Sequence, residues 1–342
     1  MHNFKNDYSV GAHPNILNRL IETNLEPQLG YGEDDYSISA KNCIKEVIQN
    51  PAAKVFFVSG GTQANLLTLS FLLRVHEAVI SANTGHIFAN ETGAIEATGH
   101  KVIAVDTKDG KLRPFDIEAT LKSYALKPHV VKPKIVFISN STEIGTAYTK
   151  LELEALFNFC QQNDLLLYLD GARLGHGLMA ENSGLTLADV ARLTDVFYIG
   201  GTKNGALLGE AIVFNKPELA VDFEFAIKQK GAMLAKGRIL AIQFIELFKN
   251  ELYFRLAKHA NTMAMKMADV MKENGCSFLT NSTTNQIFPI LSNDIIEKLS
   301  KQYLFYVWKE IDEEHSAIRL ITSWATEELV VDEFISDINR WT

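Results

Sequence analysis

The chain has 342 residues, of which 47% are hydrophobic and 22% are charged, and its formal net charge is −8. This length predicts two domains rather than one, and this composition excludes a disordered chain. The acidic balance argues against nucleic acid as a partner, because binding to phosphates along a backbone requires a basic face.

The cysteines and the length of the apolar runs indicate the compartment. Cys43, Cys160 and Cys276 are odd in number and widely spaced, so they predict neither a disulfide framework nor a CxxC metal pair. No apolar run approaches the ~20 residues that span a bilayer, and residues 1–14 lack the pattern of a secretory signal. We therefore expect a cytoplasmic protein with no membrane contact and no metal site.

Short apolar runs alternate with helix-like stretches through the first two thirds of the chain. Unbroken apolar strands between helices are typical of an α/β fold with a mostly parallel sheet, covered by helices on both faces. The predicted strands are 55–58, 79–81, 101–105, 135–139, 165–169, 196–199 and 211–214, with helices at 63–78 and 151–163.

The pattern changes after about residue 236. Residues 238–274 contain neither Pro nor Gly and predict one long helix or a kinked pair. Strands at 286–291, 303–309 and 317–321 and a helix at 327–341 are expected to follow. The predicted organisation is an N-terminal arm (1–14), a large domain (15–236) and a smaller α+β domain (237–342).

Three short segments carry the candidate chemistry, and none of them is specific alone. Asp170 ends an apolar strand, where a carboxylate can pair with the pyridinium nitrogen of pyridoxal phosphate (PLP) or simply cap a helix. Lys203 follows the next strand after two glycines, where a desolvated amine can attack an aldehyde, although an exposed turn lysine is commoner. Gly60, Gly61 and Thr62 open a helix, whose free N–H groups suit a phosphate.

In this order, the segments resemble the threonine aldolase and β-eliminating lyase family of fold-type-I PLP enzymes. The resemblance implies PLP as cofactor, a small amino acid as substrate, and a homodimer or homotetramer. It runs from residue 6 to about residue 319 through Asn6-Asp7, Tyr31-Gly32-Glu33-Asp34-Asp35, Gly61-Thr62-Gln63-Ala64-Asn65, Asp170-Gly171-Ala172-Arg173, Lys203 and Arg319-Leu320-Ile321-Thr322.

The resemblance also implies which residues bind the cofactor. Lys203 would hold PLP as a Schiff base, and Asp170 would pair with the ring nitrogen. Arg173 would face the ring hydroxyl, while Gly61 and Thr62 would hold the phosphate.

Further residues are implied for the ring face and the substrate. His86 would stack on the ring, and His129 would lie near the substrate side chain, so that either could act as a base. Arg319, together with Asn6, would grip the α-carboxylate. Tyr31 would reach the site of a neighbouring subunit.

Two departures from the family pattern bear on the substrate. Asn6 stands where family members often have Ser. The segment 140–145, Asn-Ser-Thr-Glu-Ile-Gly, replaces the more usual Glu-Asn-Thr-His-Asn, which removes a family histidine and introduces Glu143.

The expected activity is cleavage of a β-hydroxy-α-amino acid to glycine and an aldehyde, with acetaldehyde as the product from threonine. Three alternatives stay open: another PLP reaction (β-elimination, transamination or racemisation), a PLP-binding protein without turnover, and an α/β protein without PLP.

Overall fold

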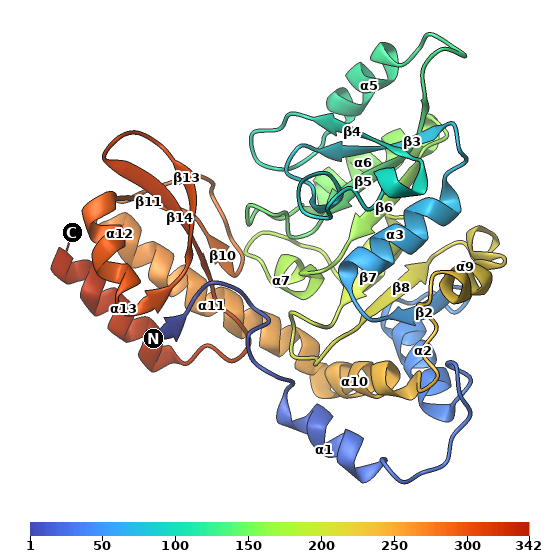
Figure 1. Ribbon diagram of the computed structural model, residues 1–342, viewed down its shortest axis with the longest axis horizontal. Helices are drawn as coiled ribbons and strands as arrows, with labels where there is room; N and C mark the ends of the chain where they lie inside the picture. The colour runs from blue at the N-terminus through green and yellow to red at the C-terminus, as the bar shows by residue number, and fades with distance from the viewer. Residues whose placement is uncertain (342) are drawn as a thin grey trace.

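The computed structural model describes residues 1–341 and has two parts joined by a long helix (Figure 1). The large part contains a seven-stranded sheet in the order β2-β8-β7-β6-β5-β3-β4, in which only β8 runs antiparallel to its neighbours. This confirms the predicted α/β fold. The strands are β2 (Lys54–Val58), β3 (Glu77–Ala82), β4 (Lys101–Val105), β5 (Lys132–Ser139), β6 (Leu166–Asp170), β7 (Val196–Gly200) and β8 (Glu210–Phe214).

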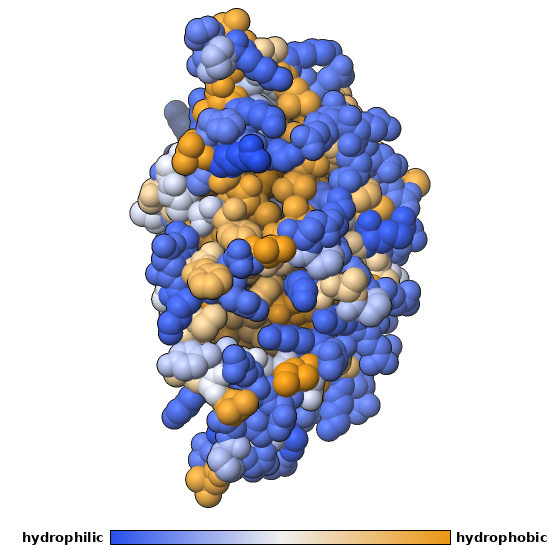
Figure 2. Space-filling model, turned by 90° about the vertical axis from the view of Figure 1, so that its right-hand side faces the viewer, coloured by the Kyte–Doolittle hydropathy of each residue, from blue (hydrophilic) through white to orange (hydrophobic). Residues whose placement is uncertain are grey.

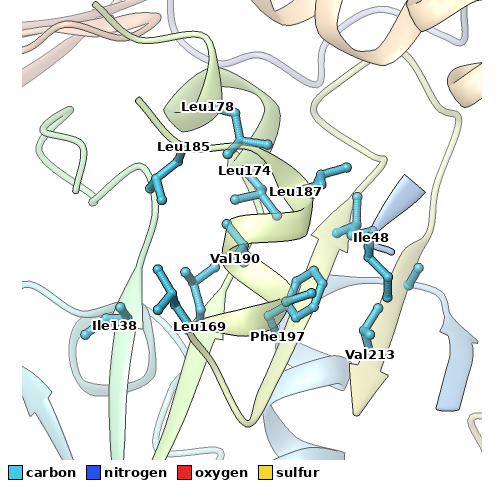
Figure 3. Packing of buried hydrophobic residues seen from close by; sticks show 14 of the residues in the cluster. Ile48, Ile138, Leu169, Leu174, Leu178, Leu185, Leu187, Val190, Phe197 and Val213 are labelled. Carbon is cyan, nitrogen blue, oxygen red and sulfur yellow. The ribbon is translucent and has the colours of Figure 1, made fainter. Parts of the chain in front are cut away.

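Helices cover both faces of this sheet, because its strands present apolar side chains on both. Along β6, Leu167 and Leu169 belong to the core on one face and Tyr168 to the core on the other. Figure 3 shows part of the first core, where Leu169 and Phe197 face the helices α7 and α8. The helices of the large part are α1 (Pro14–Glu22), α2 (Asp35–Val47), α3 (Gly61–Leu72), α4 (His86–Ala89), α5 (Pro114–Ser123), α6 (Lys150–Gln162), α7 (Leu174–Leu178), α8 (Leu187–Arg192) and α9 (Phe223–Gln229).

Local sequence explains where several of these helices begin and end. Thr149 and Glu152 form a capping box at the start of α6. The spacing of the apolar residues predicts a helix from residue 63 to residue 78, but α3 ends at Leu72. The chain turns at residues 74–77, where the Glu77 carboxylate accepts a hydrogen bond from the Arg74 N–H at 3.0 Å, and β3 begins at Glu77.

The small part packs a second sheet against helices α11 to α13. Strand β14 (His315–Ile321) pairs antiparallel with β10 (Gln286–Ile287), β11 (Pro289–Ser292) and β13 (Tyr306–Glu310), and β11 pairs with β9 (Ser277–Phe278). The N-terminal arm is bound to this part, because β1 (His2–Asn3) pairs in parallel with β12 (Tyr303–Leu304). The helices are α11 (Leu252–Glu273), α12 (Asn293–Ser300) and α13 (Glu328–Trp341).

The segment 238–274 forms a kinked pair of helices. Helix α10 (Arg238–Phe248) ends before Asn250 and Glu251, whose φ angles of 52° and 57° break the helical path, and α11 then runs on. Helix α10 packs on α1 and α2, and its side chains belong to the core of the large part. The hydrophobic core of the large part therefore gives way to that of the small part along α11, and not at residues 236–237, where the domain boundary was expected.

No helix within residues 1–341 combines the length and the apolar character that crossing a membrane requires.

Candidate active site

Six strands of the large sheet run in one direction and end at the same edge. These strands are β2, β3, β4, β5, β6 and β7. The carboxyl edge of such a sheet is the usual place for a ligand site in α/β proteins. The segments that lie at or just beyond this edge carry Gly61, His86, Asn140, Asp170 and Lys203.

Asp170 is held at the end of β6 by three donors. The Tyr198 hydroxyl donates to Oδ1 at 2.5 Å, the Ala172 N–H donates to Oδ1 at 3.0 Å, and the Asn65 amide donates to Oδ2 at 3.0 Å. The residue is only 4% exposed. All three partners donate, so both carboxylate oxygens are held in place at the strand end, where a carboxylate can pair with a pyridinium nitrogen. The alternative interpretation, in which the Asp170 side chain only caps a helix, does not describe this carboxylate.

A chain of buried polar groups links Asp170 to His86. The Asn65 amide that bonds Asp170 also donates to Oε1 of Glu91 at 2.7 Å, and this Oε1 lies 2.9 Å from Nδ1 of His86. The Tyr168 hydroxyl donates to the Asn65 oxygen at 2.9 Å. Asn65 therefore fixes the carboxylate beneath the predicted ring site and, through Glu91, the imidazole that was predicted to stack there.

Lys203 lies in the turn between β7 and β8, partly enclosed by the protein. Burial, and next to it the charge of Arg173, lower the pKa of the Lys203 amine. Among the described residues, no group forms a hydrogen bond or ion pair with this amine. A lysine with a lowered pKa is uncharged more often at neutral pH and can attack an aldehyde.

Glu210, at the start of β8, is a buried carboxyl near Lys203. It lies opposite Gly200 in the sheet, is 4% exposed, and accepts a hydrogen bond from the Gly201 N–H at 3.1 Å. Burial raises the pKa of Glu210 to about 8, although the charge of Lys203 opposes the shift. The carboxyl is therefore mostly protonated at neutral pH.

Arg173 forms a bidentate ion pair with Asp7 of the N-terminal arm, from Nε to Oδ2 at 2.7 Å and from Nη2 to Oδ1 at 3.0 Å. The Asn285 amide donates to the same Oδ2 at 2.9 Å. Burial raises the pKa of Asp7, but the charges of Arg173 and Lys203 outweigh it and bring the pKa down to about 2. Asp7 thus orients Arg173 beside the predicted cofactor site.

Arg319 projects from β14 between two aromatic rings of β13. Its guanidinium carbon lies 5.1 Å from the ring centre of Tyr306 and 4.7 Å from that of Trp308, and its Nε is buried without a hydrogen-bond partner. Burial and the charge of Arg173 lower the pKa of Arg319. A guanidinium that contacts two aromatic rings and keeps donors without a partner is suited to bind a carboxylate.

The start of α3 provides a place for a phosphate. Gly60 is the N-cap and Gly61 the first helical residue, and a Cβ at Gly61 would lie 2.9 Å from the Tyr198 hydroxyl. Because Gly61 has no Cβ, the backbone here can lie close to Tyr198, whose hydroxyl bonds to Asp170. The exposed Thr62 hydroxyl makes no hydrogen bond in the described chain, so both it and the free N–H groups of this helical turn can bind an anion.

Several buried polar atoms near this sheet edge have no partner, as expected where a polar ligand completes the site. They are Nδ2 of Asn140, Oγ of Ser141 and Nε of Arg319. Together with the amine of Lys203 and the carboxylate of Asp170, they fit PLP, which carries an aldehyde, a ring nitrogen, a hydroxyl and a phosphate.

Two of the predicted residues have less defined positions. Oδ1 of Asn6 accepts a hydrogen bond from the Tyr8 N–H at 3.1 Å, and Asn6 adjoins Asp7. Tyr31 is 54% exposed and lines a separate cavity of about 270 Å³ with Lys41, Phe57 and Glu224. Tyr31 is therefore not part of this chain's own cluster, and its role in a neighbouring subunit stays a prediction.

His129 does not lie at this chain's own site, and its predicted place near the substrate side chain stays a prediction. His129 is exposed and precedes β5, whereas the site lies beyond the other end of that strand. A strand rises ~3.3 Å per residue, so the 8 residues of β5 place His129 at the opposite edge of the sheet, on the order of 25 Å away.

Four residues of the site were not predicted individually from the sequence: Asp7, Asn65, Tyr198 and Glu210. Asp7 and Asn65 stand inside segments that carried the family resemblance, which was the available signal. Tyr198 and Glu210 lie within or beside apolar strands, where nothing in the sequence distinguishes a residue that faces a site from one that faces the core.

A half-buried lysine, a buried carboxylate and a glycine-opened helix at one edge of a mostly parallel sheet define a fold-type-I PLP site. The described molecule shares this fold with a mutant of Thermus thermophilus aspartate aminotransferase (TM-score 0.72, 13% identity, 99% of this chain and 91% of that chain).

The comparisons with known proteins identify the family. Residues 6–294 match the family model for β-eliminating lyases, and the chain belongs to this family. The low specificity L-threonine aldolase of Pseudomonas aeruginosa is 32% identical over 98% of this chain and 96% of its own length, and that of Escherichia coli K12 is 26% identical over 79% of each. The structure of Leishmania major threonine aldolase has 45% identity and a TM-score of 0.98, covering 100% of this chain and 99% of that one.

Proposed function

We propose that the protein cleaves L-threonine and related β-hydroxy-α-amino acids to glycine and an aldehyde. The similarity to threonine aldolases over nearly the whole chain supports this reaction. The single observation that carries the proposal is the placement of Lys203 and Asp170 beyond adjacent strand ends, with the Asp170 carboxylate fixed by three donors.

Bound PLP withdraws electrons from the α-carbon of an attached amino acid and thereby weakens the bonds to that carbon. Lys203 provides the covalent attachment, and Asp170 keeps the ring nitrogen protonated. Gly61 and Thr62 bind the phosphate, and Arg173, oriented by Asp7, faces the ring hydroxyl.

Substrate orientation then decides which bond of the α-carbon breaks. Arg319 fixes the carboxylate with its free in-plane donors, and Tyr306 and Trp308 hold the guanidinium in one plane. A fixed carboxylate allows the Cα–Cβ bond to stand perpendicular to the ring, which is the geometry that cleavage of this bond requires. His86, which is held by Glu91, would cover one face of the ring.

The same residues would also serve β-elimination, transamination or racemisation, so the test must identify products. We expect the PLP-reconstituted protein to convert L-threonine into equal amounts of acetaldehyde and glycine. A Lys203→Ala variant should lose this reaction. Release of ammonia with a 2-oxo acid would instead assign the protein to β-elimination and overturn the proposal.

We further propose that the protein works as a homo-oligomer in the cytoplasm. Figure 2 shows apolar atoms gathered in the middle of the face on the side of α3 and α9, and Phe225 of α9 is 74% exposed. Cys43, Cys160 and Cys276 are all unpaired, which supports a reducing compartment. Light scattering during gel filtration would test the oligomer, and a single-chain mass would contradict it.

A further inference from the structure

Glu143 lies in the turn after β5, with one carboxylate oxygen fixed and the other free. Its Oε1 accepts hydrogen bonds from the His86 N–H at 2.9 Å and from the Ser139 hydroxyl at 2.6 Å. Its Oε2 bonds to no other residue of the described chain. Oε2 of Glu91, by contrast, is buried without a partner, whereas Glu143 as a whole is half-buried. Two donors thus orient the carboxyl through Oε1 and leave Oε2 without a bond to another described residue.

The groups around Glu143 belong to the cofactor and substrate site. His86 follows β3, Asp170 ends β6 and Arg173 begins the next turn, and all three act electrostatically on Glu143. Burial first, and then the negative charge of Asp170, raise the pKa of Glu143 above its usual range, while His86 opposes this. A carboxylate whose pKa is raised is a stronger base than an ordinary glutamate.

His86 is less suited to accept a proton than Glu143. Its Nδ1 is occupied by Glu91 at 2.9 Å. Burial lowers the pKa of His86, but the bond to Glu91 and the charge of Asp170 outweigh this and raise it, so the ring tends to hold its proton. With His129 at the other edge of the sheet in this chain, Glu143 offers a carboxylate oxygen that bonds to no other described residue.

We propose that Glu143 is a catalytic residue that accepts the proton of the substrate β-hydroxyl, an assignment that rests on the proposed aldolase function. The proton moves from the hydroxyl oxygen to Oε2 of Glu143. The electron pair of the O–H bond becomes the second bond of the aldehyde carbonyl. The pair of the Cα–Cβ bond stays with the α-carbon, from which bound PLP withdraws it. After the aldehyde has left, protonation of the α-carbon completes glycine.

The test compares two reactions of the same PLP-loaded protein, of which only one involves a β-hydroxyl. Cleavage of L-threonine needs the proposed base, whereas exchange of the glycine α-proton with deuterated water needs Lys203 and PLP but no hydroxyl. In Glu143→Gln, the side chain keeps its shape and its acceptor oxygen for His86 and Ser139. Glu181→Gln, at an exposed position, makes the same change of charge away from the site.

We expect Glu143→Gln to lower kcat for threonine cleavage by about 100-fold or more, the usual effect of losing a general base. Glycine exchange should change by less than about threefold, and the acidic limb of the pH profile of kcat/KM should disappear. Ser139→Ala, which removes one orienting donor, should give a smaller loss of cleavage alone. Glu181→Gln should match the wild type in both reactions.

Three results would overturn the assignment. Threonine cleavage at the wild-type rate in Glu143→Gln would exclude Glu143 as the base. A parallel loss of cleavage and glycine exchange in both site variants would mean that the carboxyl only supports the fold of the site. A wild-type protein that exchanges glycine protons but does not cleave threonine would overturn the proposed function, and this assignment with it.

Discussion

Arg173 and Asp7, which are 166 positions apart in the sequence, share two hydrogen bonds that join the N-terminal arm to the site. Asn285 of the small part donates to the same Asp7 oxygen at 2.9 Å. Asp7 therefore connects three regions of the chain, and its charge matters for the stability of the fold as well as for the position of Arg173.

Asp7→Asn should destabilise the protein at neutral pH by about 2 kcal/mol, because the ion pair lowers the pKa of Asp7 from 3.8 to about 2. A lowered pKa stabilises the folded state above the pKa of the unfolded chain. The stabilisation is lost as the pH falls from 3.8 to about 2. Urea unfolding of both proteins across this pH range should therefore show a difference that shrinks toward acid. A difference independent of pH would contradict the account.

The aromatic pair around Arg319 predicts a defect in binding rather than in chemistry. Trp308→Ala removes the ring 4.7 Å from the guanidinium, and a cation–π contact contributes about 0.5–2 kcal/mol. We expect KM for threonine to rise roughly 3- to 10-fold, with kcat within about twofold. Val307→Ala, on the neighbouring exposed position of β13, is the matched control. Equal effects of the two substitutions would show that the rings only stabilise the strand.

Glu210→Gln should stabilise the cofactor-free protein at high pH. The pKa of Glu210 is raised from 4.5 to about 8, so the folded state keeps this carboxyl protonated while the unfolded chain ionises it. The folded state therefore loses stability as the pH rises from 4.5 through about 8, and glutamine avoids this loss. Thermal unfolding should give a higher Tm for the variant above pH 8 and similar values below pH 4.5. Coincident curves throughout would contradict this.

The arrangement of the large sheet could be predicted because its strands are buried on both faces and appear as unbroken apolar runs. The polar residues that end such runs, Asp170 and Asn140, lie where parallel topology brings strand ends together. The family and the fold predicted from these segments are confirmed.

The errors and omissions have a different origin. The place of His129 near the substrate came from the family resemblance alone, whereas the strand pattern puts His129 before β5, at the edge away from the site. The contacts of Asp7 with Arg173, of Asn65 with Asp170 and of Glu143 with His86 join residues between 57 and 166 positions apart. Such contacts depend on how the elements pack, which no local pattern encodes.

The central claim is that Lys203 binds PLP covalently, and it can be tested by reducing the PLP-loaded protein with borohydride and locating the modified peptide by mass spectrometry. The account predicts one PLP group on Lys203, loss of this modification in Lys203→Ala, and a visible absorbance band that changes on adding threonine. Modification of a different lysine in the wild-type protein, or none at all, would contradict it.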